Sequence, residues 1–260
     1  MSMKQNPREP LPSTRWVRGI VGDALVVDSR DQLLVWEEEI PVPRYVFRDE
    51  DVRSEHLIPT GPPDDLHYHH PNTEVTSWFD VVVDNHIIRH GAWRIKGLAG
   101  YTGVTWERGE FDHWYEENQE VFEHPHDPFV HIDALPSSRL VTVRHDNVVI
   151  GESREAIFLW ETGLPPRYYL PRRDIDFDLL TPTTTKSICP YKGFATDYWS
   201  VTSKSSLTDI AWSYPEPFFP YRNIAGAVAF LQEELDISID GLPQTRPVPK
   251  RWPARSRLRV

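Results

Sequence analysis

The chain has 260 residues with 39 Asp and Glu against 28 Lys and Arg, a net charge of −11. Its last 17 residues hold six Lys or Arg and no acid, so the body before them carries 22 − 39 = −17, which repels phosphate and argues against generic DNA or RNA binding. A single cysteine excludes an intrachain disulfide, and no signal-like or membrane-spanning apolar run occurs, so we expect a cytoplasmic protein without a membrane span.

Short runs of β-branched and aromatic residues, separated by turn residues and many prolines, predict a mainly β protein. In the first half we expect strands at residues 24–28, 32–36, 44–47 and 80–84. In the second half the predicted strands are 139–143, 147–150, 156–160, 167–170 and 196–201. Residues 227–235 fit either a helix or a twisted strand, and we favour strand because the matching segment 101–107 is rich in β formers.

The two halves repeat each other. Asp28-Ser29-Arg30 matches Glu152-Ser153-Arg154, and Trp36-Glu37 matches Trp160-Glu161, at a spacing of 124. A repeat of this length predicts two copies of one domain. We therefore divide the chain into a loose N-terminal segment 1–14, a first domain 15–135, a second domain 136–243 and a basic, proline-rich tail 244–260 that either extends into solvent or folds back on the acidic body.

Motifs in the second copy carry a family resemblance. They are the run from Gly163 to Asp174, the Cys189-Pro190-Tyr191-Lys192-Gly193 motif and the run from Ala211 to Pro217. Together with Trp114 to Glu117 and His124 to Phe129, they resemble the tandem form of the family called domain of unknown function 427. The resemblance implies a β-tent, in which small antiparallel sheets with few short helices pack around a pocket. The family also carries a nucleotidyltransferase-like label, but the chain lacks a P-loop and the Gly-Ser and paired-carboxylate motif of those enzymes.

The repeat predicts where the two copies differ. Aligning Trp78 with Trp199 places the histidine-rich segment 66–70 opposite the segment 188–192 that contains Cys189 and Lys192. One place in the fold then carries polar, reactive groups in both copies, but different ones.

The candidate catalytic residues are Cys189, Lys192 and Glu117. A cationic Lys192 near Cys189 favours a reactive thiolate, whereas the alternative is a buried thiol at a turn with a solvated lysine. Glu117 belongs to an acidic stretch that is either solvated or contributes one carboxylate with a pKa raised by aromatic burial.

Histidines supply the metal hypothesis. All eleven lie between His56 and His145, and His67, His69 and His70 are spaced closely enough to bind a metal. The one cofactor we consider is therefore a divalent metal. The alternative is a set of solvated or packed histidines.

Arginines and aromatic residues supply the ligand-binding candidates. Arg44 and Arg167, each followed by Tyr, either pair with acids of their own copy or anchor an anionic ligand. The rings of the second copy form either its core or a cage for a planar or cationic molecule. The ligand-binding candidates are Arg44, Arg167, Tyr168, Thr185, Tyr191, Tyr198, Trp199, Trp212 and Tyr214.

Three functions stay open on these residues. The chain binds a small molecule in one or both repeats and acts on it as an enzyme, it binds a ligand or serves as a scaffold without catalysis, or it is a metal-dependent enzyme that uses the histidines of the first copy. The partner in the first two cases is a small-molecule ligand.

Overall fold

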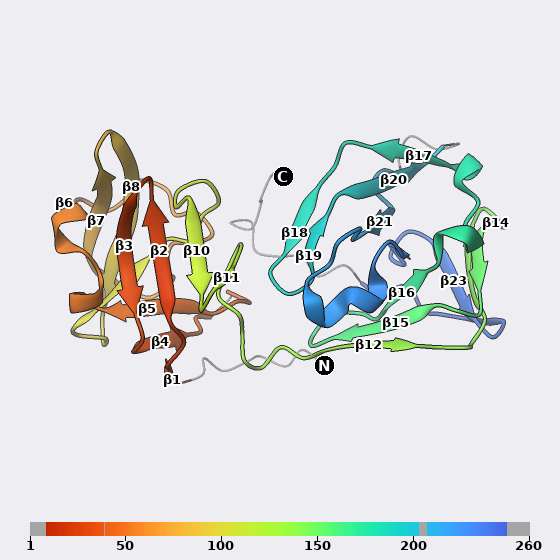
Figure 1. Ribbon diagram of the computed structural model, residues 1–260, viewed down its shortest axis with the longest axis horizontal. Coiled ribbons are helices and arrows are strands. Elements are labelled where there is room, and N and C mark those ends of the chain that lie inside the picture. Colours follow the sequence, from red (N-terminus) through yellow and green to blue (C-terminus); the bar gives the residue numbers. More distant parts are fainter. Residues whose placement is uncertain (1–8, 39, 203–206, 249–260) are drawn as a thin grey trace. The chain divides into compact units, whose positions relative to one another are not determined.

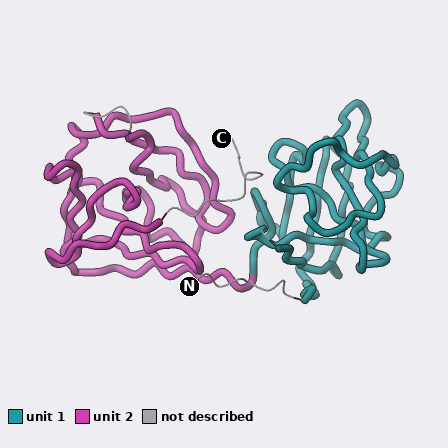
Figure 2. The backbone as a smooth tube through the Cα atoms, turned by 180° about the vertical axis from the view of Figure 1, so that it is seen from behind, with its two compact units in different colours: residues 1–127, 252–259 teal, residues 128–251, 260 magenta. Residues whose placement is uncertain are grey.

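The computed structural model describes residues 9–38, 40–202 and 207–248. The chain divides into two compact units, with unit 1 ending at Asp127 and unit 2 beginning at Pro128 (Figure 2). Both are built from antiparallel strands joined by short 3-10 turns (Figure 1), which confirms the mainly β prediction. In the described residues, no helix is long and apolar enough to span a membrane.

Unit 1 contains a seven-stranded and a four-stranded sheet. The large sheet has the order β1-β4-β5-β9-β8-β7-β6 and the small sheet has the order β11-β10-β2-β3. The strands are β1 (Leu11–Ser13), β2 (Val17–Val21), β3 (Ala24–Ser29), β4 (Gln32–Val35), β5 (Arg44–Arg48), β6 (Leu57–Thr60), β7 (Val75–Val83), β8 (His86–Ile95), β9 (Tyr101–Val104), β10 (His113–Glu116) and β11 (Gln119–Glu120), with the 3-10 turns η1 (Asp49–Asp51) and η2 (Ser54–His56).

Unit 2 repeats this plan and adds one hairpin. Its large sheet has the order β12-β15-β16-β22-β21-β20-β17, its small sheet β14-β13-β23-β24, and its extra hairpin is β18-β19. The strands are β12 (Ile132–Pro136), β13 (Val141–His145), β14 (Val148–Ser153), β15 (Ile157–Glu161), β16 (Arg167–Leu170), β17 (Leu180–Thr183), β18 (Ser187–Cys189), β19 (Gly193–Ala195), β20 (Asp197–Val201), β21 (Ala211–Ser213), β22 (Val228–Phe230), β23 (Asp236–Ile239) and β24 (Leu242–Pro243), with η3 (Arg172–Asp174), η4 (Phe177–Leu179) and η5 (Phe219–Ile224).

Each large sheet buries apolar residues on both faces. In unit 2, Tyr168 and Trp199 belong to the core between the large and small sheets, together with residues of β13 and β23. The adjacent residues Tyr169 and Tyr198 belong to a second cluster on the opposite face. Because successive side chains of a strand point to opposite faces, the second face carries its own set of side chains, which can line a site.

Strand pairing also aligns the two copies. Pro59 pairs with Phe79 in unit 1, and Pro182 pairs with Trp199 in unit 2. Phe79 therefore matches Trp199, and Trp78 matches Tyr198. The predicted match of Trp78 with Trp199 is wrong by one residue, a shift that exchanges the two faces of a strand.

The hydroxyl–carboxylate contact of the repeat recurs in both units. Ser29 donates to Asp51 and Ser153 donates to Asp174, each at 2.6 Å. These side chains tie the small sheet to the 3-10 turn that follows β5 or β16. The matched serine and aspartate positions are therefore structural.

The ends of the repeats differ from the sequence-based division. Leu11–Ser13 pairs with β4, so this part of the segment 1–14 belongs to the sheet. Likewise β12 pairs with β15 and lies in unit 2, although the sequence placed the boundary after residue 135. Within the described part of the tail, Arg246 lies 2.8 Å from Asp236, while residues 1–8 and 249–260 lie outside the described part of the chain.

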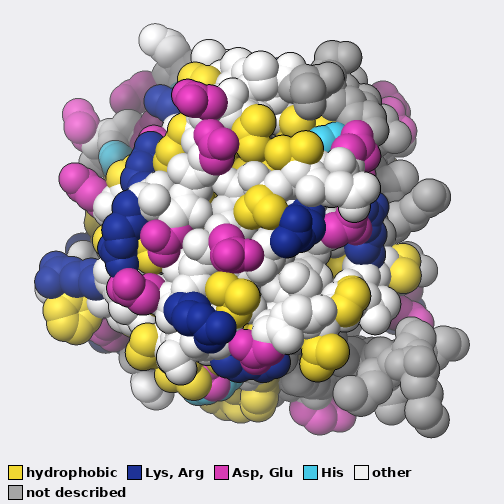
Figure 3. Space-filling model, turned by 90° about the vertical axis from the view of Figure 1, so that its right-hand side faces the viewer, with side chains coloured by type: hydrophobic (Ala, Val, Ile, Leu, Met, Phe, Trp, Pro, Cys, Tyr) yellow, Lys and Arg dark blue, Asp and Glu magenta, His cyan; other side chains and the backbone are white. Residues whose placement is uncertain are grey.

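The surface seen in Figure 3 carries acidic and basic side chains close to one another, with apolar side chains scattered between them. Mixed charge of this kind is typical of a solvated surface.

Candidate functional site

A cavity of about 350 Å³ lies on the outer face of the large sheet of unit 2. Side chains from β15, β16, β20 and β21 line it, and Lys192 reaches it from the turn of the β18–β19 hairpin. The lining residues are Leu159, Glu161, Leu164, Pro165, Arg167, Tyr169, Lys192, Tyr198, Asp209, Trp212, Tyr214 and Leu231.

Both cations of this wall are held in ion pairs. The Nζ atom of Lys192 lies 2.5 Å from Glu161 Oε2, and both side chains are buried or nearly so. Arg167 donates to both carboxylate oxygens of Glu233 at 2.7 Å. Each cation therefore already has its own carboxylate, in the second case with the bidentate geometry that suits guanidinium.

Asp209 is held differently. Thr183 Oγ1 donates to its Oδ1 at 2.7 Å, and Thr185 Oγ1 donates to its Oδ2 at 2.8 Å. The backbone of Asp209 has a positive φ of 54°, a conformation that Asp tolerates better than most residues. Two hydroxyls use two of the roughly four lone-pair directions of a carboxylate, so Asp209 keeps acceptor capacity.

The surroundings of three ionisable groups of the wall determine their protonation states. Burial raises the pKa of Tyr169 to about 12 and that of Tyr214 well above its ordinary value, so both phenols stay protonated. Burial disfavours the charged form of Lys192, but Cys189, Glu161 and Tyr169 outweigh it and raise the lysine pKa. Lys192 is therefore a fixed positive charge and a donor at neutral pH.

The structure gathers several predicted site residues and separates others. Arg167, Lys192, Tyr198, Trp212 and Tyr214 line the cavity, and Thr185 orients Asp209. Tyr168 and Trp199, predicted to bind ligand, lie in the core between the sheets instead, because their strands turn these positions inward. The free thiol Cys189 and Tyr191 are partly exposed on the hairpin beside the cavity, and neither is among its lining residues.

In unit 1, His70 packs into the matching place. The strand register matches Trp78 and Trp93 to Tyr198 and Trp212. His90 matches Asp209, because each has a positive φ and lies three residues before the matched tryptophan. The ring of His70 lies 5.0, 6.4 and 5.7 Å from those of Trp78, His90 and Trp93, and the residue is 2% exposed. Burial lowers its pKa to about 3, so it is a neutral part of this packing.

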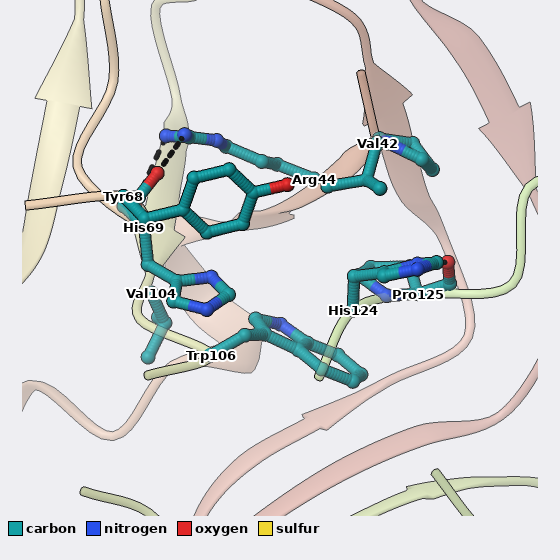
Figure 4. Close-up of a pocket in the computed structure, with 9 residues that line it drawn as sticks. Val42, Arg44, Tyr68, His69, Val104, Trp106, His124 and Pro125 are labelled. Atoms are coloured by element: carbon teal, nitrogen blue, oxygen red, sulfur yellow. Dashed lines mark hydrogen bonds between the residues drawn. The ribbon is translucent and has the colours of Figure 1, made fainter. Parts of the chain in front are cut away.

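Arg44 faces a much smaller cavity beside this cluster, of about 10 Å³, roughly room for one water molecule. Its guanidinium donates to the backbone oxygens of His69 and Tyr68 at 2.9 and 2.8 Å (Figure 4) and lies 3.3 Å from Glu37. Across the cavity stand His124 and Pro125, in Figure 4 as well. Arg44 therefore pairs with an acid of its own copy and holds the loop that carries Tyr68 and His69. Pairing with such an acid was one of the two alternatives that the sequence left open.

The histidines of the metal hypothesis face a carboxylate. His67 Nδ1 and His69 Nε2 lie 3.5 and 3.9 Å from Glu107 Oε2, while the rings of His67 and His70 lie 3.6 Å apart. Within the described ranges, no group of three or more His, Cys, Asp or Glu has a geometry that could hold a metal ion.

Glu117 lies on an exposed turn of unit 1, where its carboxylate accepts from the backbone of Trp16. Its neighbour Glu116 is buried and accepts from Tyr45, Arg15 and His126. The structure thus brings Glu117 to neither of the two cavities described above.

Both units match one known protein family. The sequence model of the family described as "domain of unknown function (DUF427)" matches residues 9–112 and again residues 133–241. The chain belongs to this family. Among curated proteins, none is similar enough in sequence to match it.

The two DUF427 domains share strand order and differ at the connection that precedes β7 or β20. In the second domain this connection forms the β18–β19 hairpin that delivers Lys192 to Glu161. In the first, the corresponding loop delivers His70 to the aromatic cluster. The same connection therefore borders a cavity in the second DUF427 domain and fills the matching site in the first.

Sequence reasoning missed Tyr169, Asp209 and Glu161 as cavity residues of the second DUF427 domain. For Tyr169 a signal existed, since residues i and i+2 of a strand share a face and Arg167 was already a candidate. Glu161 stands out in the sequence only as part of the repeated Trp-Glu pair, yet it binds Lys192. Asp209 carried no recognisable motif, because Thr183 and Thr185 meet it only in the folded sheet.

Proposed function

We propose that unit 2 binds a small organic molecule in the cavity beneath the β18–β19 hairpin. The observation that carries this proposal is a cavity of about 350 Å³ that combines aromatic rings with buried charged groups. Pockets for small molecules commonly measure about 300–1,000 Å³ and pair apolar walls with a few fixed polar groups. The size suits a ligand of one or two rings.

The wall supports binding and electrostatic stabilisation. Lys192 keeps its proton, so it serves as a positive charge and donor rather than as a nucleophilic amine. The free thiol of Cys189 lies on the same hairpin as Lys192 and is the candidate nucleophile. A Cys189→Ser variant separates the possibilities, since a binding protein keeps its affinity and a thiol enzyme loses turnover.

The two copies divide the work in this proposal. His70 fills in unit 1 the place that the cavity occupies in unit 2, and the remaining space beside it is about 10 Å³. We therefore assign ligand binding to unit 2, with unit 1 as its closed counterpart.

The test is a fragment screen by saturation-transfer NMR on the full chain. Fragments that bind wild type should lose binding when the cavity is filled by Leu231→Trp or opened by Trp212→Ala. A matched control is Trp199→Phe, on the inward face of the neighbouring strand, which should keep the fragments bound. Absence of binders, or binders unaffected by both cavity variants, would overturn the proposal.

A further inference from the structure

Charge pairing in the unit 2 cavity distinguishes one acid from the rest. Glu161 has Lys192 at 2.5 Å, and Glu233 has Arg167 at 2.7 Å. Among the described residues, the Asp209 carboxylate has two hydroxyl donors and no cation. Among the charged lining residues that the structure describes, Asp209 is thus the one whose charge is not balanced by an ion pair.

An anion and a cation would meet different conditions in this cavity. An anionic ligand would have to compete with Glu161 or Glu233 for a cation that is already paired at short distance. A cationic ligand would meet Asp209 with lone pairs to spare and no pair to break. The charged wall therefore selects positive over negative ligands.

Aromatic rings add to this preference. Tyr198, Trp212 and Tyr214 line the same cavity as Asp209. The faces of such rings carry negative potential and attract ammonium and guanidinium groups. One internal example is Arg167, whose guanidinium lies 5.6 Å from the centre of the Trp212 ring.

We propose that the ligand of unit 2 is a small organic cation, an amine with an apolar or aromatic body, whose charged group binds Asp209. This inference rests on the proposed binding function and names its ligand class. Thr183 and Thr185 orient the carboxylate from behind, and the rings of Tyr198, Trp212 and Tyr214 enclose the body of the amine. Unit 1 has His90 at the matching positive-φ position, so the acid is particular to unit 2.

The test uses three probes of similar size on the full-length protein: phenethylamine, 2-phenylethanol and phenylacetate. Titration calorimetry at pH 7 should give phenethylamine a Kd at least about ten-fold lower than that of 2-phenylethanol, with phenylacetate weakest. Asp209→Asn should abolish the preference for the amine and leave alcohol binding unchanged. Glu234→Gln, the same change at an exposed site of unit 2, should change neither.

The outcomes separate the two proposals. Equal affinity for amine and alcohol, or tightest binding of phenylacetate, overturns the cation assignment while the binding function stands. The same holds if none of the three probes binds while other fragments occupy the cavity. If the wider screen also finds no ligand, both proposals fall. The comparison of the three probes on wild type still tests the cation assignment even if Asp209→Asn does not fold.

Discussion

Lys192 donates to Glu161 in unit 2, whereas in unit 1 the matching acid, Glu37, lies 3.3 Å from Arg44. Glu161 and Glu37 stand at the same repeat position, but the cation reaches them from different elements. In unit 2 the second cation, Arg167, is thereby left to bind Glu233. A lysine on one hairpin thus changes the partner of an arginine on another strand.

The first prediction concerns the buried pair in unit 2. Lys192→Met leaves Glu161 buried without its cation and should destabilise unit 2 by about 3–5 kcal/mol. The double variant Lys192→Met, Glu161→Gln should recover much of that loss. Hydrogen exchange of the β16 and β22 amides in increasing urea reads this unit separately. Arg246→Met, which removes an exposed ion pair with Asp236, is the control and should cost less than about 1 kcal/mol. Equal losses in the two single variants would contradict the burial argument.

The second prediction contrasts two neighbouring acids of unit 1. Glu116 is buried and accepts from Tyr45 at 3.0 Å and from the His126 ring at 2.8 Å. Glu116→Ala should therefore cost about 3 kcal/mol or more, because those donors stay buried without an acceptor. Glu117→Ala, on the exposed turn beside it, should cost about 1 kcal/mol or less.

The acid dependence of Glu116 has a definite sign. Burial opposes its charge, but His126 and Arg15 outweigh burial and lower the pKa of Glu116 below the ordinary 4.5. Its stabilising effect is therefore complete above that ordinary value and is lost as the pH falls through the folded-state pKa. Wild type should lose more stability than Glu116→Gln on acidification below about pH 4.5, as chemical denaturation at several pH values can measure.

The third prediction concerns the residue that fills unit 1. His70→Ala should destabilise unit 1 by about 2–4 kcal/mol, since it removes a buried ring that packs against both Trp78 and Trp93. The space left should admit a small aromatic probe such as indole, detectable by NMR. His131→Ala, whose side chain is 77% exposed, is the control and should change neither stability nor probe binding. An unchanged stability in His70→Ala would show that this ring is not packed as described.

The fourth prediction concerns Glu110, which accepts from Thr105 at 2.6 Å. Burial, with a contribution from Glu107, raises the pKa of Glu110 to about 7. A raised carboxyl pKa stabilises the fold fully below the unfolded value and is lost as the pH rises through about 7. Glu110→Gln should therefore gain about 1–3 kcal/mol on wild type between pH 5 and pH 8. A difference that stays constant with pH, measured by urea unfolding, would contradict the raised pKa.

Sequence alone predicts the strands and the duplication well, because both depend on local pattern. Residues 44–47 and 167–170 are rich in β formers and repeat each other, and both are strands of the large sheets. The order of seven strands depends on which distant segments pair, and strand pattern does not contain that information. The presence of the strands was thus predictable from the sequence, and the order of the strands within each sheet was not.

The site was predictable only in part. Arg167, Trp212 and Lys192 stood out as charged or aromatic residues in motifs, and they line the cavity. Asp209 became a site residue only through contacts with Thr183 and Thr185 across the sheet. The motif contains both Tyr168 and Tyr169 and does not indicate which of them faces the cavity. The pleat of the strand decides this, and it turns Tyr169 toward the cavity and Tyr168 into the core.

The loop that brings histidines to unit 1 also changes how that domain responds to protons. In unit 2 the acids that pair with the two cavity cations, Glu161 and Glu233, face a lysine and an arginine, whose charges are permanent at physiological pH. In unit 1 the acid that matches Glu233 in the repeat is Glu107, and it faces the imidazoles of His67 and His69. Burial lowers the pKa of both imidazoles below the ordinary value, so they are neutral at neutral pH and take up a proton only in more acidic solution. The repeated acids therefore face permanent cations in unit 2 and neutral imidazoles in unit 1, and acidification that protonates these imidazoles adds positive charge to unit 1.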